Sequence, residues 1–249
     1  MMSESDFQKV LTSLKGKTKH LYYHLMGEPL THPLLSTFIN MASKEGFRSL
    51  ITTNGTLIKN KGRELLECGT YKINISLHSF EKQGEEYFNN YLNDIIDFIN
   101  LAKDTRTIVV LRLWNKGIDE RTNDKIISIL KENIVGEWCE NAKGIKIRNK
   151  LHIEWGERFE WPDKEADVQG DEVFCYGLRD HFGILCDGTV VPCCLDSDGV
   201  ISLGNVFSED ISDILSSPRA CAIVKGFDGR KAVEELCRRC GYAQRFVKG

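Results

Sequence analysis

Short apolar runs alternate with amphipathic segments along the first 160 residues of the chain. A run of about four to eight apolar residues is typical of a buried strand, whereas apolar residues three and four positions apart are typical of a helix. The pattern predicts strands over 19–26, 47–53, 71–77 and 107–114, a last strand or hairpin over 145–155, and helices over 3–14, 32–46, 57–69, 84–103 and 123–133. This alternation predicts an α/β fold with right-handed crossovers and a parallel sheet, either open or curved into a partial barrel.

The helical segments also indicate which side chains face the core. In the segment 3–14, Ser5 and Gln8 are spaced as in a capping box, and Pro33 suits the first turn of the segment 32–46. The apolar face is predicted to contain Phe7, Val10, Leu11 and Leu14 in the first helix, Leu34, Leu35, Phe38, Ile39 and Ala42 in the second, and Tyr87, Tyr91, Ile95 and Ile99 in the segment 84–103.

Polar residues follow the predicted strands, where the carboxyl ends of parallel strands usually carry the functional groups. These residues are Glu28, Asn54, Ser76, His78, Arg112 and Asn115. A rim with a carboxylate, a guanidinium and amides suits a zwitterionic ligand that carries hydroxyl groups. The alternative is that these positions are ordinary loops and caps, since Asn54-Gly55 is also a common turn pair.

Composition narrows the class of protein. A chain of 249 residues is long for one ordinary domain and normal for a barrel-like domain with a small appendage. The net charge of −3 does not indicate a nucleic-acid or anionic-membrane partner. No apolar run approaches the roughly 20 residues of a membrane span, and the first ten residues do not resemble a signal segment, so we expect a cytoplasmic protein.

Cysteines crowd into the last third of the chain. Only Cys68 and Cys139 lie in the first 170 residues, and the other seven are Cys175, Cys186, Cys193, Cys194, Cys221, Cys237 and Cys240. Because disulfides do not persist in the cytosol, close thiols there indicate metal binding or redox chemistry. This shift, together with the acidic stretch 161–172, predicts a first domain over 1–160 and a second over 161–249.

A hairpin precedes the adjacent pair Cys193 and Cys194. In "FGILCDGTVVPCC", two apolar stretches flank Asp187-Gly188, which is favoured turn chemistry. Because neighbouring side chains of an extended chain point to opposite faces, only one cysteine of the pair should face a shared site.

The spacing of Cys237 and Cys240 is typical of a chelate, in which two thiolates converge on one metal or one edge of a cluster. With Cys175 and one of the adjacent pair, the chain offers four thiolates. Four thiolates suit tetrahedral zinc and a [4Fe-4S] cluster equally well, so spacing alone leaves both open.

Several motifs in this order resemble one family. "HLMGEPLTHP", "TTNGTLI" and "ISLHS", followed by "ILCDGTVVPCCLD", "LGNV" and "LCRRC", are similar to the radical S-adenosylmethionine (radical SAM) enzymes with a SPASM/Twitch-type C-terminal domain. The resemblance runs from about residue 3 to 242. It implies a partial (β/α)6 TIM-like barrel that lacks its first strand, followed by a small cysteine-rich domain of a hairpin and helices.

The same resemblance implies the binding residues. Gly27 and Glu28 would contact the methionine moiety of S-adenosylmethionine, Asn54 and Ser76 would lie near its ribose, and Arg112 could pair with its carboxylate. The cysteines that match the family's ligands of one auxiliary [4Fe-4S] cluster are Cys175, Cys193, Cys237 and Cys240. No cysteine follows Cys240, which favours one auxiliary cluster over two.

One family motif has no counterpart here. Radical SAM enzymes hold the cluster that cleaves S-adenosylmethionine in a C-x-x-x-C-x-x-C loop after the first barrel strand, but no cysteine precedes Cys68. We therefore expect a truncated chain or a misplaced start, rather than true loss of the chemistry, and no activity from this chain alone.

Two classes of function remain. The resemblance implies a radical SAM oxidoreductase or maturase that acts on a small molecule or a peptide, with an electron donor such as flavodoxin or ferredoxin. The alternative is a non-catalytic zinc-binding or scaffold module built on the same four cysteines. An ordinary nucleotide-binding rim is disfavoured because the chain has no glycine-rich phosphate loop.

Overall fold

The chain forms two compact units in a computed structural model that describes residues 1–24, 26–80 and 84–246. The sheet unit contains residues 18–24 and 28–158, and the cysteine unit contains residues 1–17 and 159–246 together with 26–27. No helix in the described part of the chain has the length and apolar character needed to cross a membrane.

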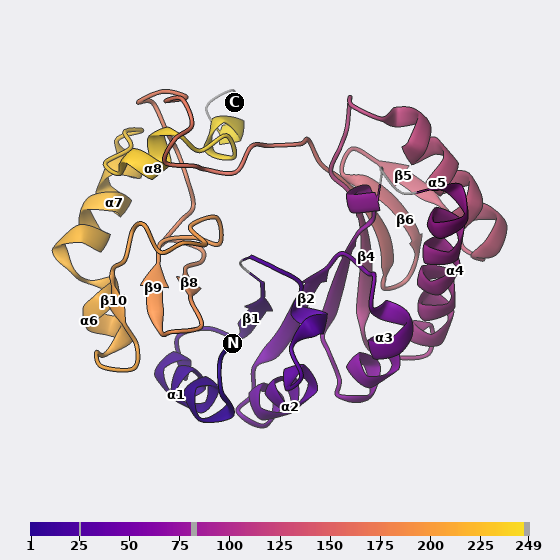
Figure 1. Ribbon diagram of the computed structural model, residues 1–249, viewed down its shortest axis with the longest axis horizontal. Coiled ribbons are helices and arrows are strands. Elements are labelled where there is room, and N and C mark those ends of the chain that lie inside the picture. The colour runs from indigo at the N-terminus through magenta and orange to yellow at the C-terminus, as the bar shows by residue number, and fades with distance from the viewer. Residues whose placement is uncertain (25, 81–83, 247–249) are drawn as a thin grey trace. The chain divides into compact units, whose positions relative to one another are not determined.

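The sheet unit is built on one mixed sheet of seven strands in the order β1-β2-β3-β4-β7-β6-β5 (Figure 1). The first five strands of this order run parallel, and the last two form antiparallel pairs. The strands are β1 (His20–Tyr23), β2 (Arg48–Thr53), β3 (Lys72–Ser76), β4 (Ile108–Leu113), β5 (Cys139–Asn141), β6 (Gly144–Arg148) and β7 (Leu151–Trp155). The predicted parallel sheet is confirmed, and the predicted last element is the β6–β7 hairpin.

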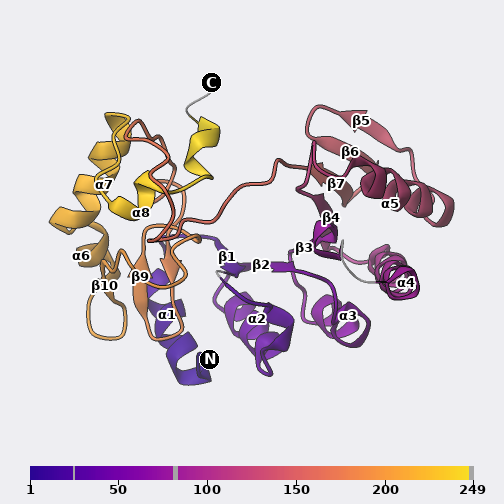
Figure 2. The same ribbon diagram turned by 45° about the horizontal axis from the view of Figure 1, so that its top comes forward.

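Helices follow the parallel strands and cover one face of the sheet (Figures 1 and 2). They are α2 (Leu35–Lys44), α3 (Ile58–Glu67), α4 (Glu85–Ala102) and α5 (Glu120–Asn133), with short 3-10 turns at Pro29–Thr31 and Leu77–Phe80. Within the described residues the sheet does not close on itself, since β1 pairs only with β2 and β5 only with β6. The architecture is therefore the predicted partial, TIM-like barrel in an open form.

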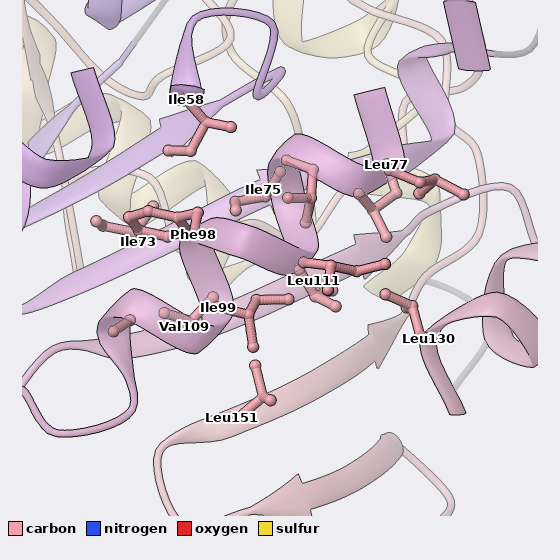
Figure 3. Packing of buried hydrophobic residues seen from close by; sticks show 14 of the residues in the cluster. Ile58, Ile73, Ile75, Leu77, Phe98, Ile99, Val109, Leu111, Leu130 and Leu151 are labelled. Carbon is pink, nitrogen blue, oxygen red and sulfur yellow. The ribbon is translucent and has the colours of Figure 1, made fainter. Parts of the chain in front are cut away.

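The core of the sheet unit lies between the sheet and these helices (Figure 3). Side chains alternate along a strand, so that every second residue faces the helices. The strand residues Ile73, Ile75 and Leu111 are fully buried there, against Ile99 of α4 and Leu130 of α5. We call the opposite side of the sheet its inner face; it carries the other half of the alternation, including Lys72, Asn74 and Arg112.

Three local predictions differ from the structure. Helix α1 (Glu4–Leu14) is capped by Ser3, whose Oγ accepts a hydrogen bond from the Asp6 backbone N–H at 3.1 Å, and Ser5 lies inside the first turn. Pro33 precedes α2, which begins at Leu35. Tyr87 is 48% exposed because the buried stripe of α4 runs through Phe88 and its neighbours one position further along.

The cysteine unit contains a three-stranded antiparallel sheet and short helices (Figure 1). Its elements after residue 159 are β8 (Gly183–Ile184), β9 (Thr189–Val191), β10 (Gly204–Asn205), α6 (Ile211–Leu215), α7 (Pro218–Asp228), α8 (Glu235–Arg238) and a 3-10 turn at Ala243–Phe246. The turn between β8 and β9 contains Asp187-Gly188, with Gly188 at a φ of +87°, as the hairpin motif predicts.

Helix α1 also belongs to the cysteine unit. Lys9 Nζ lies 5.1 Å from the ring centre of Phe207, and Lys17 Nζ donates a hydrogen bond to Ser212 Oγ at 2.6 Å. The predicted first domain, residues 1–160, therefore differs from the sheet unit mainly at its start. Helix periodicity showed that α1 has an apolar face, but it could not show which unit buries that face.

Glu28 ties the end of β1 to the end of β2. Its carboxylate accepts hydrogen bonds from Thr53 Oγ1 at 2.7 Å, from the Asn54 backbone N–H at 2.8 Å and from the Leu30 backbone N–H at 3.0 Å. Hydrogen bonds to a charged acceptor are stronger than those between neutral groups. This carboxylate therefore holds two strand-end loops together.

Truncation of a buried side chain on α4 should cost far more stability than truncation of an exposed one on the same helix. Leu92 has no exposed surface and Leu101 is 38% exposed. Leu92→Ala should lower the free energy of unfolding by about 2–5 kcal/mol, whereas Leu101→Ala should change it by less than about 1 kcal/mol. Urea denaturation followed by circular dichroism measures both, and equal losses would contradict the assigned core.

Removal of the Glu28 carboxylate should loosen both loops. Glu28→Ala should lower the free energy of unfolding by about 1.5–3 kcal/mol, because it removes hydrogen bonds to a charged acceptor. The control is Glu67→Ala, which removes an exposed carboxylate at the end of α3. If both variants unfold at the same urea concentration, Glu28 does not hold the loops.

Candidate functional site

Four cysteines from three separate segments lie in or against the apolar core of the cysteine unit. Cys175 precedes the hairpin, Cys193 follows β9, Cys237 lies on α8 and Cys240 comes after it. All four belong to, or pack against, one hydrophobic cluster that includes Val173, Leu195, Ile201, Ile223, Phe227, Leu236 and Ala243. We call these four residues the cysteine site.

The thiols of the cysteine site are close enough to influence one another. Burial raises the pKa of Cys193 to about 12, and the neighbouring thiols of Cys194, Cys175 and Cys240 raise it further. Burial also raises the pKa of Cys237, with Cys193 as its strongest charged neighbour. The site therefore disfavours thiolates unless a positively charged group compensates for them, as a metal does when it binds cysteine.

Gly177 lets the segments of Cys175 and Cys193 approach each other. Its backbone N–H donates to Cys175 Sγ at 3.4 Å. A Cβ at this position would lie 3.1 Å from Pro192 O and 3.7 Å from both Cys175 Sγ and Cys193 Cβ. A side chain here would crowd the two segments, so the glycine helps to bring two of the four cysteines together.

Cys193 and Cys194 do not lie on an extended chain, which was the basis for expecting their side chains to point to opposite faces. Cys193 and Cys194 lie in the bend and turn that follow β9, not in an extended strand. Neighbouring side chains in a turn need not point to opposite sides, and Cys194 as well as Cys175 raises the pKa of Cys240. The choice of Cys193 as a ligand therefore rests on its spacing from Cys175 and stays a prediction.

Of the remaining cysteines, Cys194 packs against the same apolar cluster and the other four do not. Cys186 and Cys221 are exposed and do not belong to the apolar cluster, and Cys139 is exposed on β5. Cys68 caps the C-terminus of α3 in the sheet unit. Among the described residues, no three His, Cys, Asp or Glu side chains are placed to hold a single metal ion.

Aromatic rings lie next to two residues of the cysteine site, Cys175 and Cys240. The sequence did not predict these ring contacts. Phe174 and Tyr176 flank Cys175, with ring centres 5.0 Å apart, and Tyr176 contacts Phe246 at 5.3 Å. Tyr242, two residues after Cys240, contacts Phe246 at 5.6 Å. An apolar shell of this kind controls the access of water to a metal site. The signal in the sequence was the presence of aromatic residues on both sides of a candidate ligand.

The other candidate residues follow the parallel strands and form two pairs, Glu28 with Asn54 and Ser76 with Arg112. Glu28 accepts from the Asn54 backbone, while the Asn54 side chain accepts from Thr56 within its own turn. Ser76 is the register partner of Arg112 across β3 and β4. Gly27 is exposed and has a φ of +94°, a backbone conformation that favours glycine.

Arg112 is held from two sides. Its Nε lies 3.4 Å from Glu154 Oε2 on β7, and its guanidinium lies 4.7 Å from the ring centre of Trp114. His78 is used structurally, since its Nδ1 lies 3.2 Å from Arg112 O and 3.3 Å from the Trp114 backbone N–H. These contacts make a preoriented guanidinium at the end of β4.

The C-terminal part of the chain matches a known domain family. Residues 175–241 match SPASM, an iron-sulfur cluster-binding domain. The matched stretch contains all four residues of the cysteine site.

Curated relatives match a longer part of the chain. A probable GTP 3',8-cyclase from Sulfolobus acidocaldarius is 27% identical over 226 residues, which cover 77% of this chain and 68% of the relative. A GTP 3',8-cyclase from Campylobacter jejuni subsp. doylei is 29% identical over 113 residues, which cover 42% of this chain and 33% of the relative. The match to the second relative thus spans only a third of its length.

Solved structures of similar fold cover nearly the whole chain. BtrN in complex with AdoMet and 2-DOIA has a TM-score of 0.60 at 17% identity and covers 96% of this chain and 80% of its own. The anSMEcpe structure with bound AdoMet and the Kp18Cys peptide has a TM-score of 0.55 at 14% identity and covers 97% of this chain and 81% of its own. Residues 175–241 thus match an iron-sulfur cluster-binding domain, and the chain as a whole is similar in sequence to GTP 3',8-cyclases and in fold to BtrN and anSMEcpe.

Proposed function

We propose that this chain is part of a radical SAM oxidoreductase or maturase with one auxiliary [4Fe-4S] cluster, as in the Twitch type. The observation that supports it is that Cys175, Cys193, Cys237 and Cys240, together with Cys194, belong to or pack against one apolar cluster. The substrate would be a small molecule or a peptide that loses a hydrogen atom.

The residues of the cysteine site fit the proposed cluster by their chemistry. Four cysteine thiolates are the usual ligand set of a [4Fe-4S] cluster. The thiols lie in an apolar setting that raises their pKa values, so a bound cluster would stabilise the thiolate forms that the protein alone disfavours. When bound, the cluster would supply an acceptor for an electron from the substrate.

The sheet unit would bind S-adenosylmethionine at its strand-end rim. In this proposal the residues Glu28, Asn54, Ser76 and Arg112 of the sheet unit form the binding surface, and the contact of Gly27 with the methionine moiety stays a prediction from the family resemblance. Glu28 keeps the loops after β1 and β2 in place, and Arg112, already oriented by Glu154, offers its guanidinium to a carboxylate. Support comes from the fold neighbours BtrN and anSMEcpe, both of which were solved with AdoMet.

The proposed reaction needs more than these residues. When bound, S-adenosylmethionine would supply the radical that takes the hydrogen atom, and its cleavage needs a cluster held by a C-x-x-x-C-x-x-C motif. The 249 residues contain no such motif. An electron donor such as a flavodoxin or ferredoxin is part of the proposal, because this cleavage consumes an electron.

Cysteine variants should separate ligands from bystanders. After anaerobic reconstitution, the chain should hold about four irons with matching sulfide and a brown colour, as for one Cys-bound [4Fe-4S] cluster. Cys193→Ala and Cys237→Ala should lose most of this iron, because each removes a proposed ligand. Iron and sulfide assays with visible absorption spectra give the measurement.

Two matched variants serve as controls for this experiment. Cys186→Ala and Cys221→Ala remove exposed thiols and should keep the iron content of the parent chain. If Cys194→Ala loses the iron and Cys193→Ala keeps it, the ligand of the adjacent pair is wrong. One zinc and no iron per chain would replace the proposal with the non-catalytic zinc-binding or scaffold function.

A further inference from the structure

A cavity of about 460 Å³ lies on the inner face of the sheet, within the sheet unit. Its volume is in the range of small-molecule sites, roughly 300–1,000 Å³. The wall comes from β1, β2, β3, β4 and β7 and from the β5–β6 hairpin. The wall includes the side chains of Tyr22, Lys72, Lys143, Lys146, His152 and Glu154.

The cavity wall carries more positive than negative charge. Lys72, Lys143 and Lys146 line it, and Glu154 is its only carboxylate. Glu154 already pairs with Arg112, which adds another cation beside the wall. Within the part of the chain that the structure describes, none of the three lysines forms an ion pair with a carboxylate. Glu154 acts on both Arg112 and Lys72, and it is a single carboxylate beside four cations.

Lys72 and His152 respond to this excess charge. The pKa of Lys72 is lowered by burial first and then by Arg112, and Glu154 opposes this shift. The pKa of His152 is lowered by burial first, and then by Lys146 and Lys72. Lys146 and His152 face each other as register partners on β6 and β7. Cations from three strands thus converge closely enough to repel one another, and an anion between them would relieve this repulsion.

A buried amide and two rings also lie on the inner face. Asn74 lies on β3 two residues after Lys72, is 1% exposed and donates from Nδ2 to Thr52 Oγ1. Its Oδ1 is buried and has no hydrogen-bond donor among the described residues. A buried acceptor without a partner costs stability, but Asn74 does not line the cavity and carries no part of the proposal. Rings of His20 and Tyr71, 5.9 Å apart, form another part of the wall.

We propose that this cavity binds a small molecule with phosphate or carboxylate groups, and that Lys72, Lys146 and His152 contact its anionic end. The identification of this molecule as the enzyme's substrate rests on the proposed function, but its binding does not. The proposal narrows the substrate class from any small molecule or peptide to an anionic one.

Anion binding to the full chain tests the proposal with two probes, pyrophosphate and citrate. Isothermal titration calorimetry at physiological salt should show binding of at least one probe to the parent chain. Lys72→Met and Lys146→Met should each weaken that binding by about tenfold or more. Binding of pyrophosphate alone would indicate a phosphate-bearing ligand, and binding of citrate alone a carboxylate-bearing one.

The control is Lys44→Met, which removes the same charge from an exposed position in the last turn of α2. It should bind the probe like the parent chain. Lys146 is exposed, so Lys146→Met should fold even if Lys72→Met does not, and circular dichroism checks both. Failure of both probes to bind, or an equal loss in Lys44→Met, would overturn the proposal.

Iron content measured on the same samples separates this proposal from the proposed function. Lys72→Met and Lys146→Met should take up as much iron as the parent chain, because neither residue belongs to the cysteine site. Anion binding without iron uptake would refute the auxiliary cluster and leave the anion site standing. Iron uptake without anion binding would refute the anion site and leave the auxiliary cluster standing.

Discussion

The alternation of side chains along the parallel strands is the constraint on which the sheet unit depends. One set of residues, such as Ile73, Ile75 and Leu111, is fully buried against the helices and supplies the core. The other set is thereby directed to the inner face, where Lys72, Asn74 and Arg112 occur on the same two strands. Apolar burial on one side thus leaves the opposite side available for polar and charged groups that a ligand can use.

The cysteine unit solves a different problem, because its regular elements are short. Its strands contain two or three residues and its helix α8 only four. Apolar residues such as Phe227 and Leu236 gather the chain around the four thiols, and aromatic rings flank Cys175 and Cys240. Bound metal commonly adds folding free energy to small domains of this kind. A bound cluster would supply such a domain with folding free energy and with a redox-active group.

The spacing of apolar residues predicted which segments form strands and which form helices. The exact ends of two helices depended on single capping hydrogen bonds. Helix α5 begins at Glu120, earlier than the predicted 123, because Asp119 Oδ1 caps it by accepting from the Thr122 backbone N–H at 3.1 Å. Ser3 rather than Ser5 caps α1 for a similar reason. Among the rim residues, the spacing of residues along the sequence could not show that the Glu28 carboxylate accepts hydrogen bonds from Thr53 and Asn54.

The sequence by itself determined the α/β class and the order of strands and helices, because periodicity is a local property, and chelate spacing predicts the set of four cysteine ligands. Only the tertiary structure decided that α1 packs in the cysteine unit, that Cys193 and Cys194 lie in a turn, and that Lys72, Lys146 and His152 share one cavity. These facts depend on contacts between residues far apart in the chain, for which spacing along the sequence carries no signal.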